Sequence, residues 1–240
     1  MAGAVDTLEL ACLWSDEVGT AEAWYRLLNV GVPITPSAGT DAFSNFYRSM
    51  AVGTTRVYVQ VEGELNLPNY LDGLRAGRSF VTTGPFLDFR VEGAGPGEVV
   101  ESGDAEFSIE LASAVPVERV EVLVNGKVVF DDEGLSSSGK KTYSGRVSLP
   151  GGGWIAARAR GGATVWPSMD SYAFAHTAAL WIGAVGSPDP ETARASAREL
   201  LAWLYVADKR LAEGYEASAI PTLKERFAAA RRKLEALSRE

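Results

Sequence analysis

An Asn-Gly dipeptide between two β-rich runs is the feature that most constrains the fold of this chain. Asn125-Gly126 separates Val120–Val124 from Lys127–Phe130. Both central residues of a tight hairpin turn need positive φ, which Asn and Gly tolerate better than other residues. The sequence therefore predicts an antiparallel β-hairpin near the centre of the chain.

More segments with a two-residue period surround this hairpin. Apolar side chains alternate with polar ones in Ala105–Ser113 and again in Thr142–Leu149. Two further β-rich runs follow at Trp154–Ala159 and Phe174–Ile182. Short strands separated by Gly, Pro and Ser residues are typical of a β-sandwich. We therefore expect residues 93–184 to form one.

Residues 1–92 differ, because helix-like and strand-like segments alternate in them. Asp16–Asn29 has apolar residues at helical spacing and is followed by Gly31, which favours a helix end. Leu67–Ala76 is a second helical segment, with β-rich runs before and after it. This order predicts βαβ units in a mostly parallel sheet or in part of a barrel. A complete (β/α)8 barrel needs about 200 residues or more, so at most part of one fits here.

The C-terminal residues have a helical period. Asp189-Pro190-Glu191 combines a capping side chain, a proline suited to the first helical position and an acid in the first turn. Gly214 interrupts the pattern, and an apolar stripe over Leu223–Leu237 predicts a second helix. The expected fold is α/β plus all-β, in three parts: 1–92, 93–184 and a C-terminal helical hairpin in 185–240.

The composition argues against several classes of protein. A net charge of −8 and a pI near 4.9 argue against nucleic acid as a partner. The single cysteine, Cys12, excludes an internal disulfide framework. No run approaches the roughly 18 apolar residues of a membrane-spanning helix, and Met1–Cys12 lacks the basic start of a signal peptide. We expect a cytoplasmic protein without a membrane partner, unless an export signal precedes residue 1.

Four residues are candidates for a functional site because of their positions in the sequence. Asp41 lies in a Gly-containing loop after a short apolar segment, where α/β barrels place metal-binding carboxylates. An Asx-turn or a helix cap also explains this aspartate. His176, the only histidine, lies in a strand-like run and is either a packed residue or a substrate contact. Arg78 and Thr83 lie around a predicted strand, which ends either in a plain turn or in a loop that contacts substrate.

Seven motifs then follow one another along the chain: Trp24–Gly31, Ser37–Ala42, Arg56–Val59, Gly73–Pro85, Val124–Gly126, Trp154–Arg158 and Phe174–Thr177. In this order they resemble the C-terminal half of the CehA/McbA family of metallohydrolases, over essentially the whole chain. Proteins of that family have a polymerase-and-histidinol-phosphatase (PHP) type barrel.

The resemblance implies both a fold and a chemistry. It implies a partial PHP-type (β/α) barrel in residues 1–92, then an immunoglobulin-like β-sandwich and terminal helices. It further implies hydrolysis of ester, amide, carbamate or phosphoester bonds of a small molecule by water that a divalent metal, Zn2+ or Mn2+, activates. Asp41 then corresponds to a metal ligand, and His176, Arg78 and Thr83 are expected to contact substrate. No catalytic residue is assigned.

The chain departs from the family pattern at its metal ligands. The histidine-rich motifs of the family would precede residue 1, and Asp41-Ala42-Phe43 stands where PHP proteins often have an Asp-x-His pair. A catalytic zinc takes about three protein ligands, so Asp41 alone does not suffice. We therefore expect an incomplete metal site and no metal bound to the isolated chain. We expect activity only with an upstream barrel segment or in a homo-oligomer. A non-catalytic binding or scaffold module derived from the family is the alternative.

Overall fold

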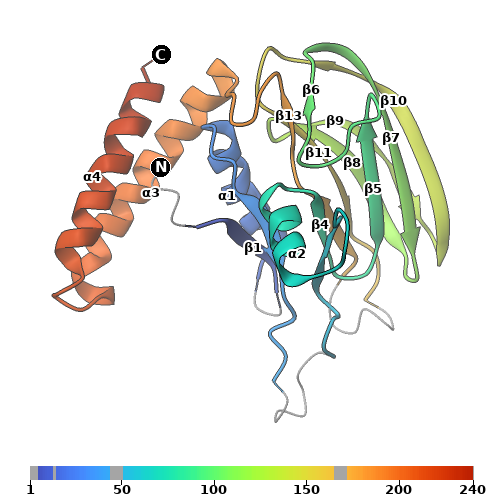
Figure 1. Ribbon diagram of the computed structural model, residues 1–240, viewed down its shortest axis with the longest axis horizontal. Helices are drawn as coiled ribbons and strands as arrows, with labels where there is room; N and C mark the ends of the chain where they lie inside the picture. Colours follow the sequence, from blue (N-terminus) through green and yellow to red (C-terminus); the bar gives the residue numbers. More distant parts are fainter. Residues whose placement is uncertain (1–4, 13–14, 44–50, 165–171, 240) are drawn as a thin grey trace.

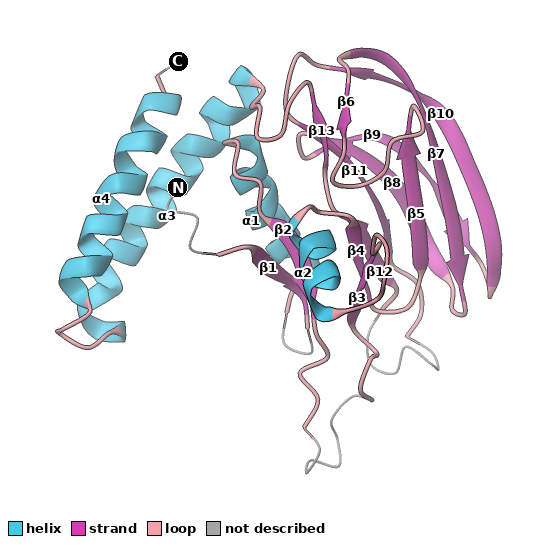
Figure 2. Cartoon of the chain, in the orientation of Figure 1, coloured by secondary structure: helices cyan, strands magenta, loops and turns pink. Residues whose placement is uncertain are grey.

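The computed structural model describes residues 5–12, 15–43, 51–164 and 172–239. Two β-sheets pack face to face, and helix α1 with a separate two-stranded sheet covers the outer face of the larger one (Figure 1). Two long helices, α3 and α4, lie beside α1, on the side away from the smaller sheet (Figure 2). The chain is therefore a mixed α/β protein with a C-terminal helix pair, as the sequence predicts.

The larger sheet is built around β11 (Trp154–Arg160). Strand β8 (Val117–Val124) pairs along one edge of β11, and β12 (Phe174–Thr177) and β13 (Leu180–Ile182) share the other edge. The sheet continues outward with β9 (Lys127–Leu135) beyond β8, β4 (Ser79–Thr82) and β3 (Arg56–Val59) beyond β12, and β6 (Val99–Val100) beyond β13. These pairs are antiparallel except β6–β13.

The smaller sheet consists of β10 (Gly139–Leu149), β7 (Gly103–Ser113) and β5 (Phe86–Val91), all antiparallel. Its inward side chains form one buried cluster with those of the larger sheet; the cluster includes Phe89, Phe107, Ile109, Val122 and Ile155. Buried and exposed residues alternate along β7, as the two-residue period of the sequence predicts.

The predicted hairpin is confirmed. Strands β8 and β9 are joined by Asn125 and Gly126, which have φ values of 52° and 84°. The Asn125 side chain also accepts a hydrogen bond from the backbone nitrogen of Trp154 at 2.8 Å. The turn is thus bonded to the first residue of the central strand, in addition to the ladders that β8 forms with β9 and β11.

The expectation of a mostly parallel sheet in residues 1–92 holds only for β1 (Thr7–Ala11) and β2 (Thr35–Ala38) in the described part of the chain. Strands β3, β4 and β5 instead join the two antiparallel sheets, which therefore contain strands from both sides of residue 92. The described strands of this segment lie in three sheets rather than in one barrel. Alternation of helices and strands in a sequence does not specify which strands pair with each other. Whether a strand lies in a parallel or an antiparallel pair depends on that choice of partner.

Helix α1 (Glu17–Asn29) begins after Asp16, whose carboxylate accepts a hydrogen bond from the backbone nitrogen of Gly19 at 3.0 Å. Its apolar residues recur at helical spacing and face the larger sheet. They form a second buried cluster with residues on the outer face of that sheet; the cluster includes Ala21, Trp24, Tyr25, Leu28, Trp154, Ala156, Phe174 and Trp181. Both faces of the larger sheet are therefore covered.

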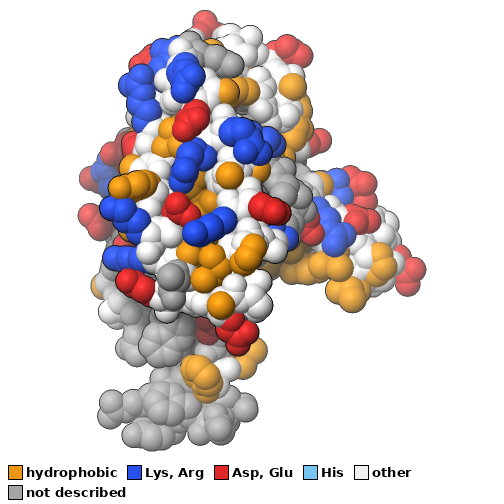
Figure 3. All heavy atoms as spheres, turned by 90° about the vertical axis from the view of Figure 1, so that its left-hand side faces the viewer, with side chains coloured by type: hydrophobic (Ala, Val, Ile, Leu, Met, Phe, Trp, Pro, Cys, Tyr) orange, Lys and Arg blue, Asp and Glu red, His pale blue; other side chains and the backbone are white. Residues whose placement is uncertain are grey.

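The C-terminal helices α3 (Pro190–Gly214) and α4 (Ile220–Leu237) pack against each other, and α3 also contacts α1. An ion pair between Arg26 and Glu199 joins α3 to α1. Lys and Arg side chains are scattered over the outer face of this pair, with hydrophobic side chains between them (Figure 3). The short helix α2 (Leu67–Arg75) connects β3 to β4.

Replacing Val122 by alanine should destabilise the protein by about 2 kcal/mol, because buried methyl groups between the sheets are lost and leave a cavity. Val122 is fully buried, whereas Val129 on β9 is 48% exposed. Val129→Ala should therefore change the free energy of unfolding by less than about 0.5 kcal/mol. Urea unfolding of both variants measures the difference, and equal effects would contradict the face-to-face packing of the sheets.

Candidate functional site

The predicted ligand Asp41 lies beside two further potential ligands. Strands β1 and β2 are parallel, with Glu9 opposite Ser37, so the loops that follow them emerge at the same edge. At this edge ligand atoms of Glu9, Cys12 and Asp41 all lie within 4.8 Å of one another. Glu9 and Asp41 are exposed and Cys12 is partly exposed, so a ligand from solvent can reach the cluster.

The two carboxylates of this cluster act on each other. Burial raises the pKa of Glu9, the charge of Asp41 raises it further, and a hydrogen bond with Cys12 opposes both effects. Neighbouring carboxylates of this kind favour a bound proton or a bound cation. Asp41 also has a φ of 54°, a left-handed conformation that is unfavourable for most residues but tolerated by Asn and Asp. The loop therefore places its carboxylate beside Glu9 in a conformation that is costly for the backbone.

The donor set suits a divalent metal. Two carboxylates and one thiol are three potential ligands, the number that protein residues contribute to a catalytic zinc. A thiolate favours zinc over manganese. Gly39 leaves space for the Glu9 side chain, because a Cβ at Gly39 would lie 3.2 Å from Glu9 Oε1. Sequence reasoning identifies only Asp41; the spacing of Glu9 and Cys12 at the end of β1 is the signal that points to the other two.

His176 lies in the interior, between α1 and the larger sheet. It is fully buried, with Nδ1 2.8 Å from the carbonyl oxygen of Thr177 and Nε2 2.6 Å from the hydroxyl oxygen of Tyr25. A carbonyl only accepts, so Nδ1 carries the proton and Nε2 accepts from the Tyr25 hydroxyl. Burial lowers the pKa of His176 to about 3, the charge of Arg158 lowers it as well, and the Thr177 bond opposes both. The imidazole is therefore neutral.

Three polar residues form a row across the outer face of the larger sheet. Glu121 on β8, Arg158 on β11 and His176 on β12 are direct neighbours on adjacent strands. Arg158 Nε lies 2.7 Å from a Glu121 carboxylate oxygen, and Arg158 Nη1 lies 3.4 Å from the Tyr25 hydroxyl. Burial raises the pKa of Glu121, but the hydrogen bonds and charges of Arg160 and Arg158 outweigh it and hold the pKa below its usual range. The row therefore contains the Glu121–Arg158 ion pair, and the Tyr25 hydroxyl connects Arg158 to the neutral His176.

Thr83 and Arg78 lie at opposite ends of β4. Thr83 is buried; its hydroxyl donates to the carbonyl of Tyr172 at 2.8 Å and accepts from the backbone nitrogen of Phe174 at 2.9 Å. Arg78 is partly exposed, and its Nη1 lies 3.5 Å from Glu62. The buried Nε of Arg78 has no hydrogen-bond partner among the described residues. Thr83 therefore joins strands, whereas Arg78 retains an unused donor.

The predicted site residues do not form one site. Asp41 belongs to the cluster at the edge of β1 and β2, whereas His176 and Thr83 are bonded within the interior. In the described ranges no hydrogen bond or ion pair links Asp41 to His176, Arg78 or Thr83. His176 contacts Tyr25 because both lie between α1 and the sheet, a tertiary relation that the local sequence does not contain.

Comparisons with known proteins add no family. No protein-family model, no curated protein and no solved structure matches this chain. The resemblance to the CehA/McbA family therefore stays a prediction. Among the helices that the structure describes, none is both long enough and apolar enough to cross a lipid bilayer.

The burial of His176 should appear in the pH dependence of stability. Its pKa is about 3 in the folded protein and about 6.5 in an unfolded chain. Between these values the unfolded state binds more protons, so this group should lower stability as the pH falls from about 6.5 towards 3, by up to about 1.4 kcal/mol per pH unit. Chemical denaturation at a series of pH values measures the slope.

The protonation of His176 can also be followed directly by NMR. Because the sequence has one histidine, its imidazole resonances in an NMR spectrum need no assignment. They should show the neutral tautomer with the proton on Nδ1 and no titration between about pH 8 and 5. A midpoint near pH 6.5 would contradict the buried, neutral state.

Proposed function

We propose that this chain contributes part of the metal centre of a PHP-type hydrolase, with Glu9, Cys12 and Asp41 as ligands of a divalent metal. The observation that supports the proposal best is the approach of their ligand atoms to within 4.8 Å of one another at the edge of β1 and β2. The presence of a thiol among the ligands favours zinc, and manganese is the weaker choice.

Two independent arguments lead to the same aspartate. The Ser37–Ala42 motif assigns a metal-ligand role to Asp41 through the resemblance, without reference to any neighbour in space. Glu9 on β1 and Cys12 just after it lie beside Asp41, so the number of potential ligands is three rather than one. A divalent metal there would supply Lewis acidity for the hydrolysis of an ester, amide, carbamate or phosphoester.

The residues of this chain have separate tasks in the proposal. The three ligands hold the ion, and Gly39 keeps the Glu9 carboxylate free to approach it. Arg78 stays a proposed substrate contact through its partly exposed guanidinium, which pairs with Glu62, whereas its Nε, unpaired in the described part of the chain, is buried and not open to a ligand. His176 and Thr83 are fully used by internal hydrogen bonds and position the strands instead.

The remaining parts of the proposal follow from the resemblance. The two packed sheets correspond to its immunoglobulin-like β-sandwich, and the separate sheet of β1 and β2, with α1 between them in sequence, to the edge of the PHP-type barrel predicted in residues 1–92. A small molecule is the substrate, and a further barrel segment or a second copy of the chain completes the site. The cytoplasm is the proposed compartment.

A second candidate function is a non-catalytic binding or scaffold module. The observation in its favour is that His176 and Thr83, two of the three predicted substrate contacts, are buried and bonded within the protein. This candidate requires no metal at the Glu9 cluster, so a metal-binding measurement separates it from the hydrolase.

The chain should take up about one zinc ion per molecule after dialysis against zinc, measured by mass spectrometry of metals. Asp41→Asn and Cys12→Ser should each weaken zinc binding by about tenfold or more, because each removes a charged ligand. Asp104→Asn, which changes an exposed carboxylate on β7, serves as the matched control and should leave zinc binding unchanged. Manganese should bind more weakly than zinc.

Hydrolysis of p-nitrophenyl acetate by the zinc-loaded chain then separates the alternatives. Zinc uptake without hydrolysis supports a partial site that needs further ligands. Zinc uptake with hydrolysis that Asp41→Asn abolishes supports a site that this chain completes in itself or with a second copy. If no zinc is retained, or if Asp41→Asn retains as much zinc as the control, the hydrolase proposal is overturned in favour of a scaffold.

A further inference from the structure

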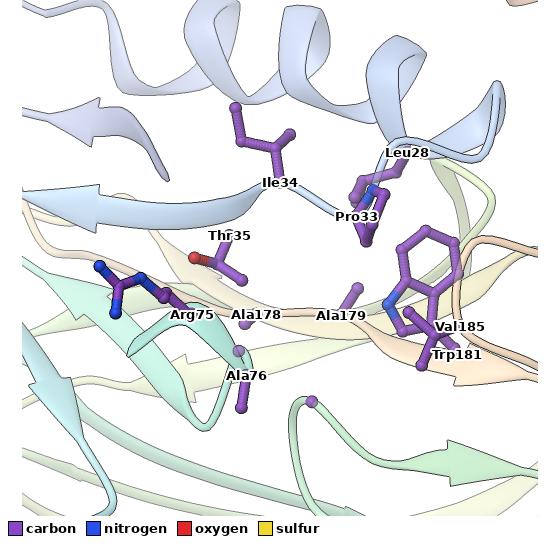
Figure 4. A pocket seen from close by; sticks show the side chains of 12 residues that line it. Leu28, Pro33, Ile34, Thr35, Arg75, Ala76, Ala178, Ala179, Trp181 and Val185 are labelled. Carbon is purple, nitrogen blue, oxygen red and sulfur yellow. The ribbon is translucent and has the colours of Figure 1, made fainter. Parts of the chain in front are cut away.

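A small cavity lies beside the C-terminal end of α1. Its volume is about 260 Å³, and its walls come from the end of α1, from β2, from the end of α2 and from β13. Leu28 and Pro33 form the upper wall and Ala178 and Ala179 the lower one (Figure 4). These walls are apolar, so the cavity favours a ligand with an apolar body.

One end of the cavity contains an indole N–H donor that opens onto the cavity. Trp181 is 5% exposed, and its indole Nε1–H, which is open to the cavity rather than enclosed by protein, makes no hydrogen bond to a described residue. The indole nitrogen faces the cavity beside Ala179 (Figure 4). The other two buried tryptophans of this layer are both satisfied: Trp24 Nε1 donates to the carbonyl of Ile34 at 2.8 Å, and Trp154 Nε1 donates to Asn29 at 2.7 Å.

The difference between Trp181 and the other two tryptophans indicates which group a ligand would supply. Buried tryptophan residues usually have a hydrogen-bond partner for the indole N–H, so an N–H that opens onto a cavity is suited to bind an acceptor there. Trp154 and Trp181 are direct neighbours on β11 and β13, yet Trp154 has an acceptor within the protein, whereas Trp181 has none in the described ranges. An acceptor supplied by a bound molecule would satisfy Trp181.

The opposite end of the cavity is polar and contains one guanidinium, which lies beside two carboxylates. The Thr35 hydroxyl and the Arg75 guanidinium lie there, away from Trp181 (Figure 4). Arg75 is 53% exposed and pairs with Asp6 at 3.0 Å and with Asp72 at 3.5 Å. These are surface pairs, which contribute little to stability, and they use Nε and Nη1, so the N–H donors of Nη2 have no acceptor within the described part of the chain. A carboxylate can therefore bind at this end.

We propose that this cavity binds a small organic acid, with its carboxylate at Arg75 and Thr35, its apolar body between Pro33 and Ala179, and an acceptor oxygen at the indole of Trp181. The volume is below the range for drug-sized ligands, so the ligand has roughly ten non-hydrogen atoms. The site is separate from the Glu9 cluster and does not depend on the metal proposal.

The probe is 4-hydroxyphenylacetate, which carries a carboxylate and a hydroxyl oxygen at opposite ends of an apolar ring. Two-dimensional NMR of the chain resolves the indole N–H groups of its six tryptophans, and the Trp181→Phe spectrum identifies the Trp181 signal by its loss. Addition of the probe should shift this signal downfield with saturation, while the signal of the exposed Trp203 stays in place.

Variants of Trp181 and Arg75 test the two polar ends of the cavity separately. Trp181→Phe should weaken binding about fivefold, the effect of one net hydrogen bond, measured by calorimetry, whereas Trp203→Phe should leave the affinity unchanged. The neutral amide of the probe should bind about tenfold more weakly than the acid, and Arg75→Gln should remove this preference. Because Asp41→Asn should leave binding of the acid unchanged, failure here is distinguishable from failure of the metal site.

Three results would overturn the proposal. One is a Trp181 signal that does not shift with the acid up to about 20 mM, a concentration that detects even weak fragment binding. Another is an equal shift of the Trp181 and Trp203 signals, which would show non-specific binding. The third is equal affinity for the acid and the amide, which would remove the role of Arg75.

Discussion

The packing of α1 on the outer face of the larger sheet determines the rest of this structure. At its centre Tyr25 donates to the neutral His176 and accepts from Arg158, which is paired with Glu121. The Arg158 and Glu121 side chains are only 8% and 3% exposed. Removing one partner of a buried pair costs about 3–5 kcal/mol, because the other charge then stays buried without compensation. The helix thus has one orientation on the sheet that satisfies every member of the chain of hydrogen bonds.

The orientation of α1 on the sheet affects both proposed sites. The loop after α1 leads into β2, so the helix positions the strand whose end carries Asp41 beside Glu9. The last turn of the same helix supplies Leu28 to the cavity that Trp181 faces. The proposed metal ligands and the proposed acid site therefore depend on the same buried contact, although their chemistry is independent. Substitutions at Tyr25 would affect both through the fold rather than through either ligand.

Much of the local structure follows from the sequence, because it depends on neighbours along the chain. The positive φ values of Asn125 and Gly126 and the cap of α1 by Asp16 are examples. Relations across the fold could not be predicted in this way. The direction of pairing of β3 to β5, the bond from Tyr25 to His176 and the approach of Glu9 to Asp41 each join segments far apart in the sequence. The expected role of His176 at a substrate site rested on the resemblance of its Phe174–Thr177 motif to the CehA/McbA family, and a local motif says nothing of how deeply its histidine is buried.

The central claim is that Glu9, Cys12 and Asp41 form the protein part of a metal centre. X-ray absorption at the zinc edge of the zinc-loaded chain tests it most directly, since the thiol distinguishes this cluster from any group of surface carboxylates. The account predicts one sulfur ligand at about 2.3 Å together with oxygen ligands at about 2.0–2.2 Å. A spectrum with oxygen ligands and no sulfur, or one unchanged in Cys12→Ser, would contradict it.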